Sequence, residues 1–78
     1  MRIRFPKEIK LHCVQILVVE YEGEECELDM NCKVSFSPGQ EFDGVEIDEE
    51  TPTDVRIWLR NDLVALNVNR GWFEIVES

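Results

Sequence analysis

Polar and apolar residues alternate without exception from residue 25 to residue 36. A period of two is typical of a β-strand that has one face in water and the other against a core. The pattern therefore predicts an amphipathic strand. Its predicted inward side chains are Cys26, Leu28, Met30, Cys32, Val34 and Phe36, and its predicted outward side chains are Glu25, Glu27, Asp29, Asn31, Lys33 and Ser35.

The preceding segment, residues 8–21, is rich in β-branched residues and is apolar on both faces near its middle, which favours a strand inside a sheet. A two-residue turn at Glu22 and Gly23 would pair positions whose numbers sum to about 45, so that Leu17 faces Leu28. A slip by one residue would turn charged side chains toward the core, at the cost of burying them. We therefore predict a long hairpin in this register, while a longer loop pairing positions that sum to about 47 would keep the same faces.

Shorter strands and turns are predicted in the rest of the chain. A strand ends before a proline that lacks a backbone N–H, and Pro-Gly, Asp-Gly and Asn-Asp pairs mark turns. The expected elements are a strand at 2–5, a turn at 37–40, an extended run at 41–47 interrupted at 43–44, a hairpin of 55–60 with 63–68 in which Val64, Leu66 and Val68 are in step, a tight 3₁₀-type turn at 69–71 and a last strand at 72–76.

Residues 52–60 also have the start signals of a short helix. Thr51 would be the N-cap and Pro52 the first helical residue, with apolar side chains at Val55, Trp58 and Leu59. The β-branched residues and the clean alternation favour a strand, and the helix stays open as the alternative. In either case we expect an all-β fold, a small antiparallel barrel of five to six strands with a long N-terminal hairpin.

The organisation of residues 30–78 resembles that of Src-homology-type small barrels, and it is similar to short uncharacterised phage and bacterial proteins. The segments that carry the resemblance are Phe36-Ser37-Pro38-Gly39-Gln40-Glu41-Phe42, the charged loop after it, the Val-x-Ile/Leu hairpin, and Arg70-Gly71-Trp72-Phe73-Glu74-Ile75-Val76. The resemblance implies the barrel fold only. The aromatic groove that binds proline-rich peptides is not matched, because Tyr21 and Trp58 are the only candidate outward aromatic residues, and no binding residue is carried over.

Length and composition predict a single domain over residues 1–78. A chain of 78 residues supports one small core. Three cysteines without CxxC spacing do not form a closed disulfide framework, and the N-terminal segment lacks the apolar run of a signal peptide. No apolar stretch approaches the roughly 18 residues that a membrane span needs. These features predict a cytoplasmic protein without membrane contact.

Charge is distributed unevenly along the chain, which has a net charge of −9. Residues 20–54 contain thirteen acidic residues and one basic residue, Lys33, whereas Arg2, Arg4, Lys7 and Lys10 lie within the first ten residues. The pattern predicts a bipolar molecule whose acidic side attracts basic surfaces and repels phosphate backbones and anionic lipid.

The sequence contains no motif for catalysis, for a metal or for a cofactor. His12, Cys13, Cys26 and Cys32 are potential metal ligands, but neighbouring strand residues point to opposite faces, and Cys26 lies roughly 20 Å along the strand from Cys32. We therefore expect no metal, no cofactor and no enzymatic activity. A disulfide between Cys13 and Cys32 under oxidation is a minor hypothesis.

We expect a non-enzymatic acidic module that binds a basic protein surface, and its sharpest form is a phage-type inhibitor or nucleic-acid mimic. The alternative is a structural or assembly protein that self-associates through strand edges. Direct nucleic-acid binding through the arginines and Trp58 is the least expected hypothesis, because the net charge opposes it. The predicted partner-binding residues are Glu22, Glu24, Glu25, Glu27, Asp29, Glu41, Asp43, Glu46, Asp48, Glu49, Glu50 and Trp58.

Overall fold

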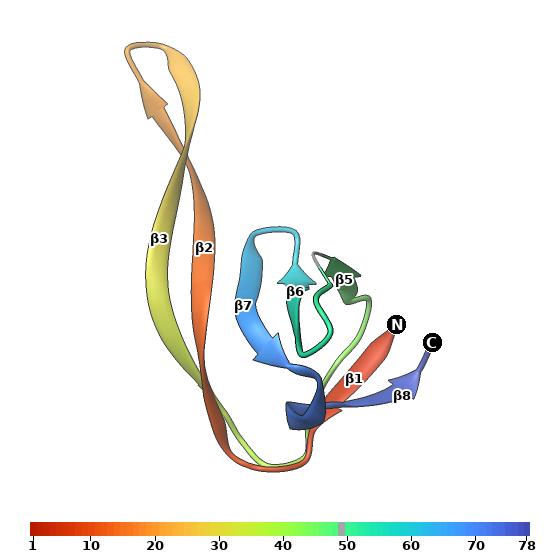
Figure 1. Ribbon diagram of the computed structural model, residues 1–78. Coiled ribbons are helices and arrows are strands. Elements are labelled where there is room, and N and C mark those ends of the chain that lie inside the picture. The colour runs from red at the N-terminus through yellow and green to blue at the C-terminus, as the bar shows by residue number, and fades with distance from the viewer. Residues whose placement is uncertain (49) are drawn as a thin grey trace.

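The computed structural model describes residues 1–48 and 50–78, and these form an all-β fold of two antiparallel sheets (Figure 1). The sheets have the strand orders β4-β1-β8 and β3-β2-β7-β6-β5. The elements are β1 (Arg2–Phe5), β2 (Ile9–Tyr21), β3 (Glu24–Phe36), β4 (Gln40–Phe42), β5 (Glu46–Asp48), β6 (Asp54–Arg60), β7 (Leu63–Asn69), the 3₁₀ turn η1 (Arg70–Trp72) and β8 (Glu74–Glu77).

The all-β prediction is confirmed, but the expected single barrel of five to six strands is not seen. The part of the chain described here forms eight strands in two separate sheets, and these do not close into a barrel. Within the same residues, no helix is long and apolar enough to cross a membrane.

The long hairpin β2–β3 has the predicted register. Leu17 lies opposite Leu28, and every pair from Ile9 with Phe36 to the turn follows the same sum. Glu22 and Gly23 have φ angles of 52° and 79°, the paired positive values of a type I′ turn whose twist suits a two-residue hairpin. The register that keeps apolar residues on one face is therefore fixed by this turn.

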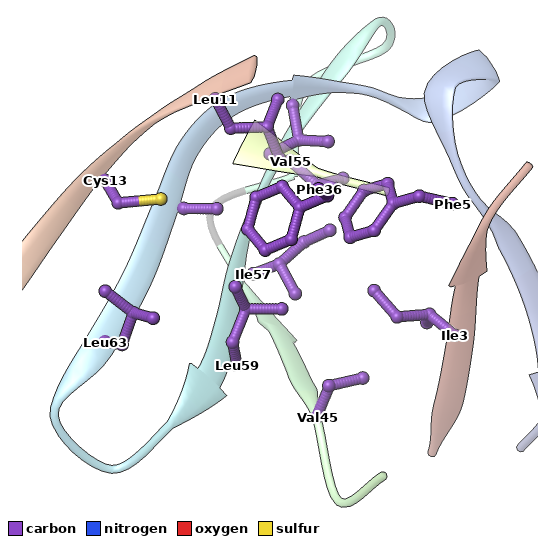
Figure 2. Close-up of a cluster of buried hydrophobic side chains, with 12 residues drawn as sticks. Ile3, Phe5, Leu11, Cys13, Phe36, Val45, Val55, Ile57, Leu59 and Leu63 are labelled. Carbon is purple, nitrogen blue, oxygen red and sulfur yellow. The ribbon is translucent and has the colours of Figure 1, made fainter. Parts of the chain in front are cut away.

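The core lies between the two sheets, where β1 meets the base of the hairpin (Figure 2). The Phe5 ring stacks on the Phe36 ring with a centroid separation of 4.9 Å, and Phe42 meets both rings edge-on. These rings come from β1, β3 and β4, so their packing joins the three-stranded sheet to the five-stranded one. Offset and edge-to-face aromatic pairs are favourable beyond the area that they bury.

Most of the shorter predicted elements are confirmed, with three corrections. Residues 54–60 form a strand, and the Thr51 hydroxyl accepts from the Asp54 backbone N–H at 2.8 Å in a turn instead of capping a helix. The prediction that Val64, Leu66 and Val68 alternate onto one face of the strand is wrong. Asn67 has a φ of 53° and breaks the alternation, so that the core cluster takes Leu63, Ala65 and Val68 from β7. The last strand begins at residue 74 and not at residue 72, because η1 occupies residues 70–72.

The distal half of the hairpin extends beyond the other strands of both sheets (Figure 1). β2 pairs with β7 only through residues 13–15, and one further bond joins the Ile16 N–H to the Asp62 carbonyl at 2.8 Å. We call residues 16–30, which lie beyond this point, the arm. The long axis of the molecule is 44 Å, against 23 and 20 Å for the other two axes.

The predicted inward row of β3 is correct in its facing and only partly correct in its burial. Phe36 is buried and Val34 and Cys32 are half-buried, but the exposed fractions of Leu28 and Met30 are 51% and 53%. β2 lies between β3 and β7, which confirms the prediction of a strand inside a sheet, but its middle is exposed at Val18. The reason is length, since the strands of the hairpin have 13 residues each whereas β6 and β7 have 7 each.

A matched pair of substitutions tests whether the hairpin has a covered base and an uncovered arm. Leu11 is 2% exposed and Leu28 is 51% exposed, although both belong to the same face. Leu11→Ala should lower the free energy of unfolding by about 2–4 kcal/mol, because it removes core contacts and leaves a cavity. Leu28→Ala should change it by less than about 1 kcal/mol. Urea denaturation of both variants measures the difference, and equal losses would contradict an uncovered arm.

Candidate functional site

The arm contains a concentration of acidic side chains without a basic one. Its six carboxylates belong to Glu20, Glu22, Glu24, Glu25, Glu27 and Asp29, and residues 16–30 include no lysine, arginine or histidine. Glu20 lies directly opposite Glu25 in the hairpin. Like charges in directly opposed positions destabilise a sheet, so this arrangement is not explained by the stability of the arm.

Elsewhere, each of the five arginines has an acidic partner. Arg2 donates to Asp43 at 2.6 Å, and Arg4 donates to Glu74 at 2.6 Å. The N-terminal arginines are therefore neutralised in the folded chain, whereas Lys7 and Lys10, at the base of the hairpin, form no ion pair among the described residues. The other pairs are Arg56 with Asp48, Arg60 with Asp62, and Arg70 with Glu50.

The predicted partner-binding residues fall into two groups in the structure. Among the residues described, Glu22, Glu24, Glu25, Glu27 and Asp29 form no ion pair and lie together on the arm. Glu46 also has no ion pair in the described part of the chain, but it lies on β5, away from the arm. The residues that pair with arginines are Glu41, Asp43, Asp48 and Glu50, and Glu49 lies outside the described residues.

Asp48 belongs to a small polar cluster that includes Trp58. Its carboxylate accepts from Arg56 Nε at 2.6 Å and from Trp58 Nε1 at 3.0 Å, and the Arg56 guanidinium carbon lies 5.9 Å from the centre of the Trp58 ring. The bond from Arg56 lowers the pKa of Asp48 below its ordinary value, with a further contribution from Trp58. Trp58 faces outward, as predicted, since it alternates with the buried Ile57 and Leu59, but it is half-buried in this cluster and not fully exposed.

The cysteines are free thiols. Cys13 and Cys32 lie opposite each other, as the register predicted. Burial, which disfavours the thiolate, raises the pKa of Cys13 to about 11. Cys13 therefore lacks the reactivity of a nucleophilic cysteine at neutral pH. Within residues 1–48 and 50–78, no three His, Cys, Asp or Glu side chains are grouped as a metal site.

A groove of about 480 Å³ lies at the base of the hairpin, the end away from the tip of the arm. Its wall includes Trp72, which is 46% exposed, beside Lys7 and Lys10. The remaining lining residues are Pro6, Glu8, Ile9 and Gly71. The groove therefore combines two lysine side chains, one carboxylate and an exposed aromatic ring.

The alternating pattern predicted the outward facing of Glu25, Glu27 and Asp29 correctly, but it did not predict that much of the apolar row on the other face of the arm is uncovered. This row lies on the face that continues from the core, and it consists of the exposed Leu17, Leu28 and Met30 and the half-buried Val19 and Cys26. A signal for it was present in the predicted lengths of the strands. A 13-residue strand spans roughly 43 Å, and two partner strands of about half that length cannot cover all of it.

No protein-family model, no curated protein and no solved structure matches the chain. The resemblance to Src-homology-type barrels therefore stays a prediction.

Asp48 gives a testable dependence of stability on pH. Because its pKa is lowered by folding, its contribution is present above the unfolded value of 3.8 and is lost as the pH falls through the lower folded pKa. Asp48→Asn should therefore lower the thermal midpoint at pH 7, and this deficit should be smaller at a pH below the unfolded value of 3.8. Glu8→Gln, at an exposed position without an ion pair among the described residues, serves as the control. A deficit of the same size at both pH values would contradict the ion pair.

Proposed function

We propose that this protein is a non-enzymatic acidic module that binds a basic surface of another protein. The observation that carries the proposal is the arm, which contains six carboxylates and no basic residue, while the arginines of the rest of the chain are each paired with an acid. Unpaired charge of one sign on a projecting element raises the rate of association with a surface of opposite sign.

The arrangement of the arm supports a role in binding more than a role in solubility. Acids that only maintain solubility need no common location, yet six of the seventeen acidic residues lie within residues 16–30. The opposed pair of Glu20 and Glu25 lowers the stability of the hairpin. A basic partner would offset this repulsion in the complex.

A nucleic-acid mimic, such as a phage-type inhibitor, is the sharper form of the proposal. Such a protein presents carboxylates where a nucleic acid presents phosphates, so that it competes for the same basic surface. The pairing of Arg2, Arg4, Arg56, Arg60 and Arg70 with acids supports this form over direct nucleic-acid binding by the chain itself.

Affinity capture with a pair of charge-reversed variants tests the proposal. Glu25→Lys with Glu27→Lys reverses two charges on the arm. Glu8→Lys with Glu46→Lys reverses two charges on the rest of the chain, which we call the body. We expect a basic protein that the wild type captures at low salt, that the arm variant captures at least about tenfold less, and that the body variant still captures. Capture should fall steeply at about 0.5 M salt because of screening.

Two results would contradict the proposal. One is a partner whose capture is the same at both salt concentrations, because electrostatic attraction would then play no part. The other is equal loss of capture by the two variants, which would assign the effect to net charge and not to the arm.

Self-association is the second candidate function, and the exposed apolar row of the arm favours it. Leu28 and Met30 are about half exposed on an edge strand, and exposed apolar edges promote pairing between copies. Sedimentation velocity over about a hundredfold range of concentration measures this. A dimer that Leu28→Lys with Met30→Lys converts to a monomer would support assembly. A monomer throughout would exclude it, and that is the result that the acidic-module proposal expects.

A further inference from the structure

The outer edge of β3 is open along its length. β3 is the terminal strand of the five-stranded sheet, and its only partner strand in the described chain is β2. No backbone bond of the loops reaches it from residues 1–48 or 50–78. An open edge of this kind accepts an additional strand, with main-chain hydrogen bonds supplying affinity and alternate side chains supplying specificity.

One hydrogen bond shows which backbone groups of β3 face this edge. The Ile16 N–H donates to the Asp62 carbonyl, so Ile16 directs its backbone away from β3. Asp29, the residue opposite Ile16, then directs its own N–H and C=O away from β2. By alternation, the backbone groups of Glu25 and Glu27 also face outward, whereas those of Cys26, Leu28 and Met30 bond to β2.

The side chains next to this edge form two rows on opposite faces. Glu25, Glu27 and Asp29 lie on one face, and Cys26, Leu28 and Met30 lie on the other. Leu28 and Met30 are 51% and 53% exposed. A strand that pairs with residues 25–30 would therefore meet acidic neighbours on one face and uncovered apolar neighbours on the other.

We propose that residues 25–30 of β3 accept an added antiparallel strand from the basic partner, a strand in which basic and apolar residues alternate. The inference rests on the proposed function and names the partner segment. Basic side chains directly opposite Glu25, Glu27 and Asp29 form opposite-charge pairs, and apolar side chains opposite Cys26, Leu28 and Met30 cover the apolar row.

A second copy of this chain does not fit the edge as well. An antiparallel pairing of two β3 edges about an axis perpendicular to the sheet would place the two acidic rows side by side. Like charges in neighbouring strands are destabilising, and charged edge strands are a common protection against edge-to-edge pairing. The charges of the edge therefore favour a basic strand over a copy of β3.

A synthetic heptapeptide, Lys-Val-Lys-Leu-Lys-Val-Lys with blocked ends, is the probe. It is titrated into the full-length protein, and amide hydrogen exchange is followed residue by residue. We expect the amides of Glu25, Glu27 and Asp29 to become protected on binding, while those of Cys26, Leu28 and Met30 change little because they already bond to β2. Such alternating protection is the signature of strand addition, and binding to a face of the arm would not produce it.

Three controls accompany the titration. A peptide with N-methylated lysine amides lacks the donors that face β3 and should bind at least about tenfold more weakly. Glu25→Lys with Glu27→Lys should weaken binding of the parent peptide by about tenfold. The matched body variant, Glu8→Lys with Glu46→Lys, should change it by less than about threefold, because those positions lie away from the edge.

The outcomes separate this inference from the proposed function. If the peptide binds in a salt-dependent manner without alternating protection, or if N-methylation has no effect, strand addition is wrong while a basic partner still stands. If the peptide does not bind although a basic protein is captured through the arm, strand addition is again wrong. If neither the peptide nor any basic protein binds through the arm, both proposals fail.

Discussion

The single register of the β2–β3 hairpin is the constraint on which the rest of the structure depends. One type I′ turn at Glu22 and Gly23 fixes the pairing over thirteen positions. Since side chains alternate strictly, the pairing that directs Leu11 and Phe36 into the core also directs Leu17 and Leu28 onto the same face of the arm. A core-facing row at the base therefore produces an uncovered apolar row at the tip.

The distribution of charged side chains differs between the body and the arm. In the body, acidic and basic side chains meet across strands, as Arg4 does with Glu41 and Glu74. These exposed pairs contribute little stability individually, but they pair each arginine with an acidic side chain. In the arm, the carboxylates remain without basic neighbours. The combination of an apolar row and an acidic row on one open strand is what points to a basic, extended partner.

Much of the fold could be predicted from the sequence, because local patterns determine it. The alternation over residues 25–36 was sufficient for the hairpin and the facing of its side chains, and of the two registers that the sequence left open the structure has the one with the two-residue turn at Glu22 and Gly23. The choice of β7 side chains that face the core could not be predicted. It depends on the left-handed conformation of Asn67, which interrupts the alternation and has no distinctive neighbour in the sequence. The two sheets are joined where Phe5 meets Phe36 and Phe42, and Phe5 lies far from these two residues in the chain, so local patterns do not predict the contact. For the candidate site, alternation gave the facing of Leu28 and Met30 correctly, but their burial depends on whether another strand reaches them.

The most direct test of the account is a measurement of cross-strand contacts in the arm of the free protein by nuclear Overhauser effects. In the observed register, Glu27 lies opposite Val18 and Asp29 opposite Ile16 in the closely spaced type of antiparallel pair, so their Hα protons should give strong mutual signals. Strong Hα–Hα signals for these two pairs would establish that the arm is a regular hairpin beyond the body. Their absence, or signals from a register shifted by one residue, would contradict the ordered acidic and apolar rows on which the account rests.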